Sequence, residues 1–119
     1  MPTRCFLSGK IHRATVTESR LDYEGSISVD QELLTRAGIL AFEQVDVYNV
    51  TNGDRLSTYA IPGDPGQVCL NGAAARRSQP GDLVIIAAFA WLGPEEIPGH
   101  KPRIVLVGPG NQPCPDSPC

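Results

Sequence analysis

The residues best suited to chemistry in this sequence are Gly25 and Ser26, which end the segment Leu21-Asp-Tyr-Glu-Gly-Ser26. A serine hydroxyl can attack the carbonyl carbon of the preceding residue and convert the amide into an ester. Elimination across the serine Cα–Cβ bond then leaves dehydroalanine, which hydrolyses to an N-terminal pyruvoyl group and ammonia. Glycine before the serine suits the attack, because it has no Cβ and tolerates strained backbone angles. The dipeptide alone is more typical of an ordinary turn.

Other candidates for chemistry are spread along the chain, and each has an ordinary structural interpretation. Lys10, Arg55 and Tyr59 carry side chains of types that functional sites use, but charged and aromatic side chains of this kind are also common on strand surfaces. The small residues of segment 71–75 leave backbone N–H groups accessible at the start of an expected helical turn.

No metal-binding pattern is present. His12 and His100 lie far apart, and no Cys, Asp or Glu stands at a ligand spacing from either. The sequence also contains no phosphate-binding loop, dinucleotide-binding motif or Gly-x-Ser-x-Gly segment. We therefore expect neither a metal nor a nucleotide cofactor.

The elements that must position these residues are mostly short strands. Apolar residues alternate with polar ones, and Gly/Pro turns separate the runs, as is typical of a small closed β-barrel. One short helix is expected at 31–37, with Asp30 as N-cap and Gly38 as the terminating glycine. Strands are expected at 4–17, with a break at Gly9, and at 44–50, 55–61, 68–70, 83–89 and 103–107.

Composition limits the classes of function. A chain of 119 residues with 41% hydrophobic residues predicts one globular domain, placed at residues 1–107. A net charge of −3 argues against nucleic-acid binding, and the longest apolar run, 83–92, is too short to span a membrane. No signal peptide is recognisable, so we expect a cytoplasmic protein without a membrane partner. The Pro- and Cys-containing segment 108–119 is expected to be a flexible tail.

Six segments, taken in order, resemble the family of pyruvoyl-dependent aspartate 1-decarboxylases. The resemblance extends over about residues 3–107 and is far more specific than any single motif. The segments are Lys10-Ile-His-Arg-Ala-Thr-Val-Thr17, Leu21-Asp-Tyr-Glu-Gly-Ser26, Asn49-Val-Thr-Asn-Gly53, Ser57-Thr-Tyr-Ala-Ile61, Asn71-Gly-Ala-Ala-Ala75 and Gly81-Asp-Leu-Val-Ile-Ile86.

The resemblance implies a six-stranded double-psi β-barrel with short helices, assembled as a homotetramer with active sites between neighbouring subunits. It implies cleavage between Gly25 and Ser26 into a β chain, 1–25, and an α chain, 26–119, that begins with the pyruvoyl group. The implied reaction converts L-aspartate into β-alanine and carbon dioxide for pantothenate and coenzyme A synthesis. Whether maturation requires an accessory protein is left open.

The resemblance also implies roles for individual residues. The substrate amine forms a Schiff base with the pyruvoyl group at position 26, and Tyr59 then protonates the α-carbon. Thr58 polarises the Gly25 carbonyl during cleavage and contacts the substrate afterwards. The substrate carboxylates are bound by two cations and a backbone segment, and three further residues line the pocket. The residues implied to bind substrate are Lys10, Arg55, Thr58, Gly72, Ala73 and Ala74. The residues implied to line the pocket are Tyr23, Asn71 and His12.

Two departures from the family pattern leave the substrate open. The loop after Tyr59 is shorter than expected and carries Asp64-Pro65-Gly66, and Arg76 stands where a histidine is common. The alternatives are therefore a pyruvoyl decarboxylase of another amino acid, or a non-catalytic double-psi barrel that binds a partner while Gly25-Ser26 stays intact.

Overall fold

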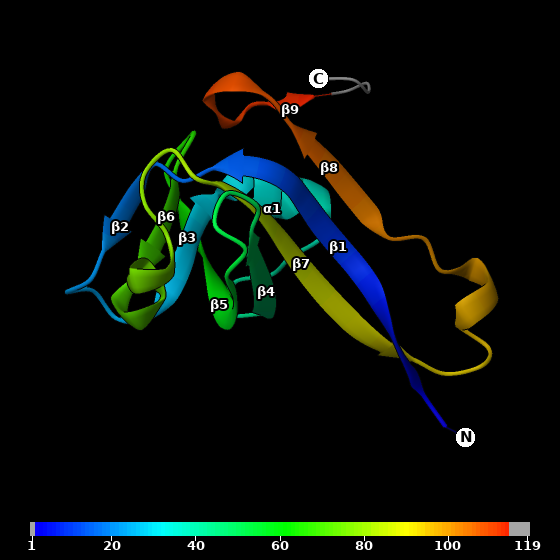
Figure 1. Cartoon of the computed structure of the whole chain (residues 1–119). Coiled ribbons are helices and arrows are strands. Elements are labelled where there is room, and N and C mark those ends of the chain that lie inside the picture. Colours follow the sequence, from blue (N-terminus) through cyan, green and yellow to red (C-terminus); the bar gives the residue numbers. More distant parts are fainter. Residues whose placement is uncertain (1, 115–119) are drawn as a thin grey trace.

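The computed structural model describes residues 2–114, and half of the chain forms one twisted β-sheet (Figure 1). The neighbour order is β2-β6-β3-β5-β4-β7-β1-β8-β9. The prediction of a mainly β fold is therefore confirmed. The strands are β1 (Arg4–Thr15), β2 (Glu18–Arg20), β3 (Ser26–Asp30), β4 (Gln44–Asn49), β5 (Arg55–Gly63), β6 (Val68–Asn71), β7 (Leu83–Leu92), β8 (Arg103–Val107) and β9 (Pro113–Cys114).

The sheet differs from the expected barrel in two respects. It has nine strands within the described residues instead of six, and their pairings leave it open between β2 and β9. Three of the pairings are parallel, namely β1 with β8, β2 with β6 and β3 with β5, and the others are antiparallel. A closed six-stranded double-psi barrel is thus not confirmed.

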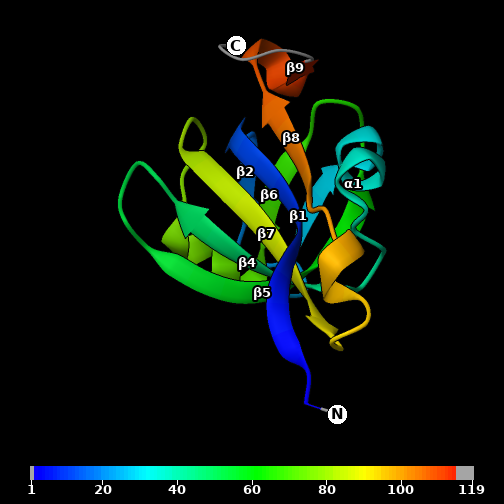
Figure 2. The same ribbon diagram turned by 90° about the vertical axis from the view of Figure 1, so that its right-hand side faces the viewer.

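The helix α1 (Gln31–Ala37) is found where the sequence predicts it. Asp30 caps it, since its Oδ1 accepts a hydrogen bond from the Glu32 N–H at 2.8 Å, and Gly38 ends it in the left-handed conformation. Leu33 and Leu34 are fully buried. Their face of α1 packs against β1, β3 and β8, so the helix covers one side of the sheet (Figure 2).

The sequence predicts a break in the first strand at Gly9, and this prediction is wrong. Strand β1 continues through Gly9 with a bulge between Leu7 and Gly9. A Cβ at Gly9 would overlap the carbonyl oxygen of Ala37, at the end of α1. Glycine is therefore required here for close packing of the strand against the helix, and it does not mark a turn.

The segment after residue 107 continues the sheet as far as the structure describes it. Residues 109–114 form the short helix η3 (Pro109–Asn111) and strand β9, which pairs with β8. The buried Asn111 side chain accepts a hydrogen bond from Thr15 N at 2.7 Å and donates to the carbonyl oxygens of Thr15 and Gly66. Residues 115–119 lie outside the described part of the chain.

Two further 3-10 helices complete the fold, η1 (Gly72–Arg77) and η2 (Ile97–Gly99). None of the helices between residues 2 and 114 is long and apolar enough to cross a membrane. The helix η1 directly follows β6 and, as described below, forms one wall of the pocket that reaches Gly25.

Candidate active site

The Gly25–Ser26 bond lies where the loop after β2 enters strand β3. Ser26 is only 2% exposed, and its hydroxyl has two neighbours. Asn71 Nδ2 donates a hydrogen bond to Ser26 Oγ at 2.9 Å, and Oγ lies 3.5 Å from the carbonyl oxygen of Glu24. The serine is thus held in a polar environment at the start of a buried strand.

The first residue of η1 fixes the backbone beside this bond. Gly72 has a φ of +62°, and a Cβ there would lie 2.7 Å from Gly25 N and 2.8 Å from both Gly25 Cα and the Tyr23 carbonyl oxygen. These are backbone atoms, which cannot give way as a flexible side chain can. A Cβ at Gly25 itself would meet nothing within 4 Å. The peptide before Ser26 is therefore packed on the η1 side and open on the other.

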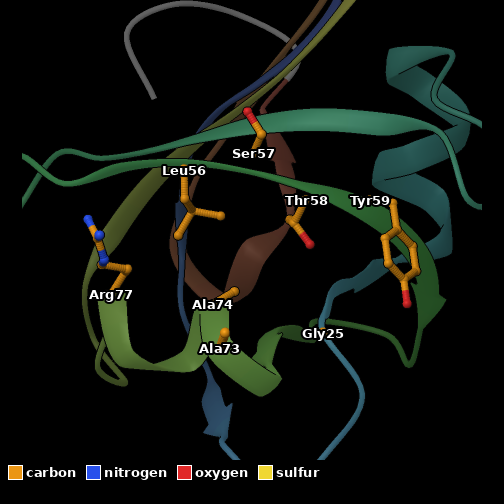
Figure 3. A pocket seen from close by; sticks show the side chains of 8 residues that line it. All are labelled: Gly25, Leu56, Ser57, Thr58, Tyr59, Ala73, Ala74 and Arg77. Carbon is orange, nitrogen blue, oxygen red and sulfur yellow. The ribbon is translucent and has the colours of Figure 1, made fainter.

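A pocket of about 490 Å³ lies between β5 and η1 and reaches Gly25 (Figure 3). Strand β5 forms one wall with four consecutive residues, and η1 forms the opposite wall (Figure 3). Among the residues expected in the site, it brings together Gly25, Thr58, Tyr59, Ala73 and Ala74. Leu56, Ser57 and Arg77 complete the lining.

Strand pairing explains why Thr58 and Tyr59 lie beside the Gly25–Ser26 bond. Strand β3 pairs in parallel with β5, with Ile27 opposite Ala60, and in antiparallel fashion with β6, with Ser26 opposite Asn71. Ser26 therefore begins β3 between the two strands that carry Tyr59 and Asn71.

A hydrogen-bond network joins the β4–β5 hairpin to η1. The side-chain Oδ1 of Asn49 accepts from the N–H groups of Thr51 and Asn52, which shapes the predicted Asn-Gly turn. The amide groups of Asn49 and Asn52 both donate to the carbonyl oxygen of Arg77 at 3.1 Å. Both walls of the pocket are thus tied together at the Arg77 end.

Arg77 is the charged residue of the pocket lining, and it is not among the residues that the sequence predicts for the site. Its guanidinium is about half exposed and lies 3.9 Å from the Asp54 carboxylate. The available signal was its position three residues after Ala74, which is one turn of a 3-10 helix and places the two on the same side of η1.

Four expected residues do not line this pocket in the single chain. Lys10 and His12 lie on β1, which β7, β4 and β5 separate from β3. The Arg55 guanidinium stacks 4.3 Å from the centre of the Tyr48 ring, which lies opposite it on β4. Tyr23 is exposed; Arg20 stacks on its ring and donates a hydrogen bond to its hydroxyl.

Two of the other expected residues contact the Gly25–Ser26 segment without lining the pocket. Asn71 is buried and contacts Ser26 instead of lining the cavity, and Gly72 contacts Gly25 through its backbone.

His12 has an unusual environment. Its Nδ1 is buried and has no hydrogen-bond partner among the described residues. Burial of the ring lowers the pKa of His12, and the positive charges of Lys10 and Arg13 lower it further. The neutral imidazole is therefore favoured. Within residues 2–114, no three His, Cys, Asp or Glu side chains gather as metal ligands would.

Taken together, the fold and the site define a small, mainly β protein with a pocket of mixed polar and apolar lining beside a glycine–serine bond. The family model described as aspartate decarboxylase matches residues 2–114. The chain therefore belongs to the aspartate decarboxylase family.

Individual relatives agree with this assignment over nearly their full length. The chain is 52% identical over 111 residues to the aspartate 1-decarboxylase of Methylibium petroleiphilum, and the alignment covers 92% of each protein. It is 56% identical over 117 residues to the aspartate 1-decarboxylase of Acaryochloris marina, covering 97% of this chain and 89% of the relative. The corresponding protein of a Hydrogenobaculum species is 54% identical over 108 residues.

Proposed function

We propose that this protein decarboxylates L-aspartate to β-alanine and carbon dioxide, which supplies β-alanine for pantothenate and coenzyme A. The observation that carries the proposal is the pocket at Gly25, which also presents Thr58 and Tyr59. The relatives' shared name, aspartate 1-decarboxylase, supports aspartate as the substrate.

The reactive group arises by self-cleavage of the chain. Ser26 Oγ attacks the carbonyl carbon of Gly25, and the Thr58 hydroxyl polarises that carbonyl from the pocket side. The resulting ester breaks by elimination, so residues 1–25 become the β chain and residues 26–119 the α chain. The open space at Gly25 supports this step, since nothing within 4 Å would hinder a change of geometry on that side.

The residues around position 26 suit a pyruvoyl group. The small side chains of Ala73 and Ala74 and the open Gly25 side leave room for it beside β5. Such a group supplies a ketone that binds an amine and accepts the electron pair released when carbon dioxide leaves. Tyr59 holds the proton that is delivered to the α-carbon, since a positioned phenol can act as a general acid.

An acidic substrate needs several donors. The backbone N–H groups of Gly72, Ala73 and Ala74 bind one carboxylate, and Thr58 contributes a hydroxyl. Arg55 offers a two-pronged guanidinium and Lys10 a second charge for the other carboxylate.

A homotetramer accounts for the residues that one chain leaves outside its pocket. Lys10, His12, Tyr23 and Arg55 reach the pocket of a neighbouring subunit in this proposal. The separation of β1 from β3 by three strands supports the need for such a partner. Residues 1–107 form the double-psi barrel of each subunit.

Product analysis with a panel of amino acids tests the proposal. Purified protein is incubated with aspartate, glutamate or cysteine, and carbon dioxide and the amine product are quantified. We expect β-alanine from aspartate as the main product. Faster release of carbon dioxide from glutamate or cysteine would identify that amino acid as the substrate in place of aspartate. If cleaved protein released no carbon dioxide from any of the three, the proposed reaction would be refuted. Cleavage during cell-free translation with purified components shows whether maturation needs an accessory protein.

A further inference from the structure

Four polar side chains lie together on one face of the β3–β6 pair. Ser26 pairs with Asn71 and Ser28 pairs with Cys69, and side chains two residues apart on a strand point to the same face. Cys69 is 1% exposed, Asn71 and Ser26 are each 2% exposed, and Ser28 is partly exposed at the edge of the cluster.

The cluster forms a directed chain of hydrogen bonds. The Cys69 thiol donates to Asn71 Oδ1 at 3.2 Å; its other acceptor, the Leu70 carbonyl oxygen, lies at 3.9 Å. Asn71 Nδ2 in turn donates to Ser26 Oγ at 2.9 Å and to Ser28 Oγ at 3.0 Å. Both amide protons and the amide oxygen therefore have partners, and the direction of the chain runs from Cys69 to Ser26.

We propose that Cys69 is a positioning residue for self-cleavage, because its thiol holds the Asn71 amide with Nδ2 toward Ser26 Oγ. The inference rests on the proposed cleavage and adds a residue that acts through Asn71. Without a donor at position 69, Asn71 Oδ1 has no hydrogen-bond partner in the observed orientation. The amide could then turn by 180°, so that Oδ1 accepts hydrogen bonds from the hydroxyls of Ser26 and Ser28.

The orientation matters for the chemistry at Ser26. In the first step Oγ forms a bond to the carbonyl carbon of Gly25, the C–N bond breaks, and the hydroxyl proton passes to the nitrogen of residue 26. In the second step a base removes the Cα proton, the Cβ–Oγ bond breaks, and its electron pair stays on Oγ. This oxygen leaves as part of the Gly25 carboxylate, so a donor on Oγ stabilises the developing negative charge. A reversed amide would present an acceptor oxygen to that charge.

The thiol is present in its donating form. Burial raises the pKa of Cys69, the Glu18 carboxylate raises it further, and Arg20 opposes the shift. A raised pKa keeps the proton on sulfur at neutral pH, and a thiolate could not donate to Asn71.

Variants at position 69 separate the donor from its volume. Cys69→Ala removes the donor and leaves a small space, whereas Cys69→Val removes the donor and fills it. Both variants should cleave roughly two- to tenfold more slowly than wild type, which is the effect expected from the loss of one buried hydrogen bond. Cys69→Ser restores a donor and should recover most of the wild-type rate. Thermal unfolding of each variant serves as a control for loss of the fold.

The rate is measured on fresh precursor from cell-free translation, by following the full-length chain and its fragments over time by mass spectrometry. A double-mutant cycle gives the sharpest test. Asn71→Ala should slow cleavage, and adding Cys69→Ala should slow it no further. Wild-type cleavage by Cys69→Ala, slow cleavage by Cys69→Ser, or additive effects in the double variant would overturn the inference while leaving the proposed function intact. A wild-type precursor that never cleaves would overturn both.

Discussion

Replacement of Gly72 by alanine tests how the start of η1 positions the bond before Ser26. The residue has a φ of +62°, a region that costs an L-residue about 1–2 kcal/mol. The added Cβ would also lie 2.7 Å from Gly25 N and 2.8 Å from Gly25 Cα, so the loop at 23–25 must shift. Overpacking of this kind adds about 1–3 kcal/mol. We expect Gly72→Ala to lower the free energy of unfolding by about 2–5 kcal/mol in total.

Gly110→Ala is the matched control. Its φ of +69° is nearly the same, but a Cβ there would meet nothing within 4 Å. We expect it to cost only the backbone contribution of about 1–2 kcal/mol.

The assay is urea unfolding followed by circular dichroism, at one fixed protein concentration because subunit assembly makes stability concentration-dependent. Both changes are made in a Ser26→Ala chain, which lacks the attacking hydroxyl and should stay intact, so that the transition concerns one polypeptide. In the Ser26 chain, Gly72→Ala should also delay cleavage, whereas Gly110→Ala should not. Equal losses of stability for the two variants, together with wild-type cleavage by Gly72→Ala, would refute the proposed contact between η1 and Gly25.

Three further variants probe the substrate pocket. Tyr59→Phe should cleave at the wild-type rate but lose roughly 10²–10⁴-fold in kcat, since it lacks the donor; an unchanged kcat would exclude Tyr59 as the general acid. Arg77→Gln should raise KM for aspartate roughly two- to fivefold, as expected for the loss of a half-exposed charge. The control variant Arg76→Gln should leave KM unchanged; an equal rise in KM for both variants would indicate a general effect of lost positive charge. Arg55→Ala should raise KM with little effect on cleavage, and an unaffected KM would argue against a carboxylate clamp.

Local signals were enough to predict much of the fold. The helix α1 follows from its cap at Asp30 and its terminating glycine at Gly38, both of which act within a few residues. Most strands follow from two-residue alternation, and the β4–β5 hairpin follows from Asn52-Gly53. The role of Gly9 could not be predicted from local signals. Glycine is required there because a Cβ would overlap the carbonyl oxygen of Ala37, which is distant in sequence.

The site was predictable only in part. The pairing of β3 with β5 and β6 brings Gly25, Thr58 and η1 together, and no local pattern contains that register. Arg77 lines the pocket, and its carbonyl oxygen accepts hydrogen bonds from Asn49 and Asn52, which are distant in the sequence. Segment 109–114 is joined to the rest of the fold through Asn111, whose partners Thr15 and Gly66 are far away in the chain. Polar side chains that join distant segments leave no periodic signal in a sequence.

The most direct test of the account is the intact mass of the purified protein, measured before and after reduction with borohydride in the presence of aspartate. We predict two chains, 1–25 and 26–119, with a pyruvoyl group in place of Ser26 at the start of the longer one. That chain alone should gain the mass of a reduced adduct of aspartate or of its decarboxylated product, β-alanine. A single uncut chain of 119 residues that retains Ser26 and forms no adduct would contradict the account.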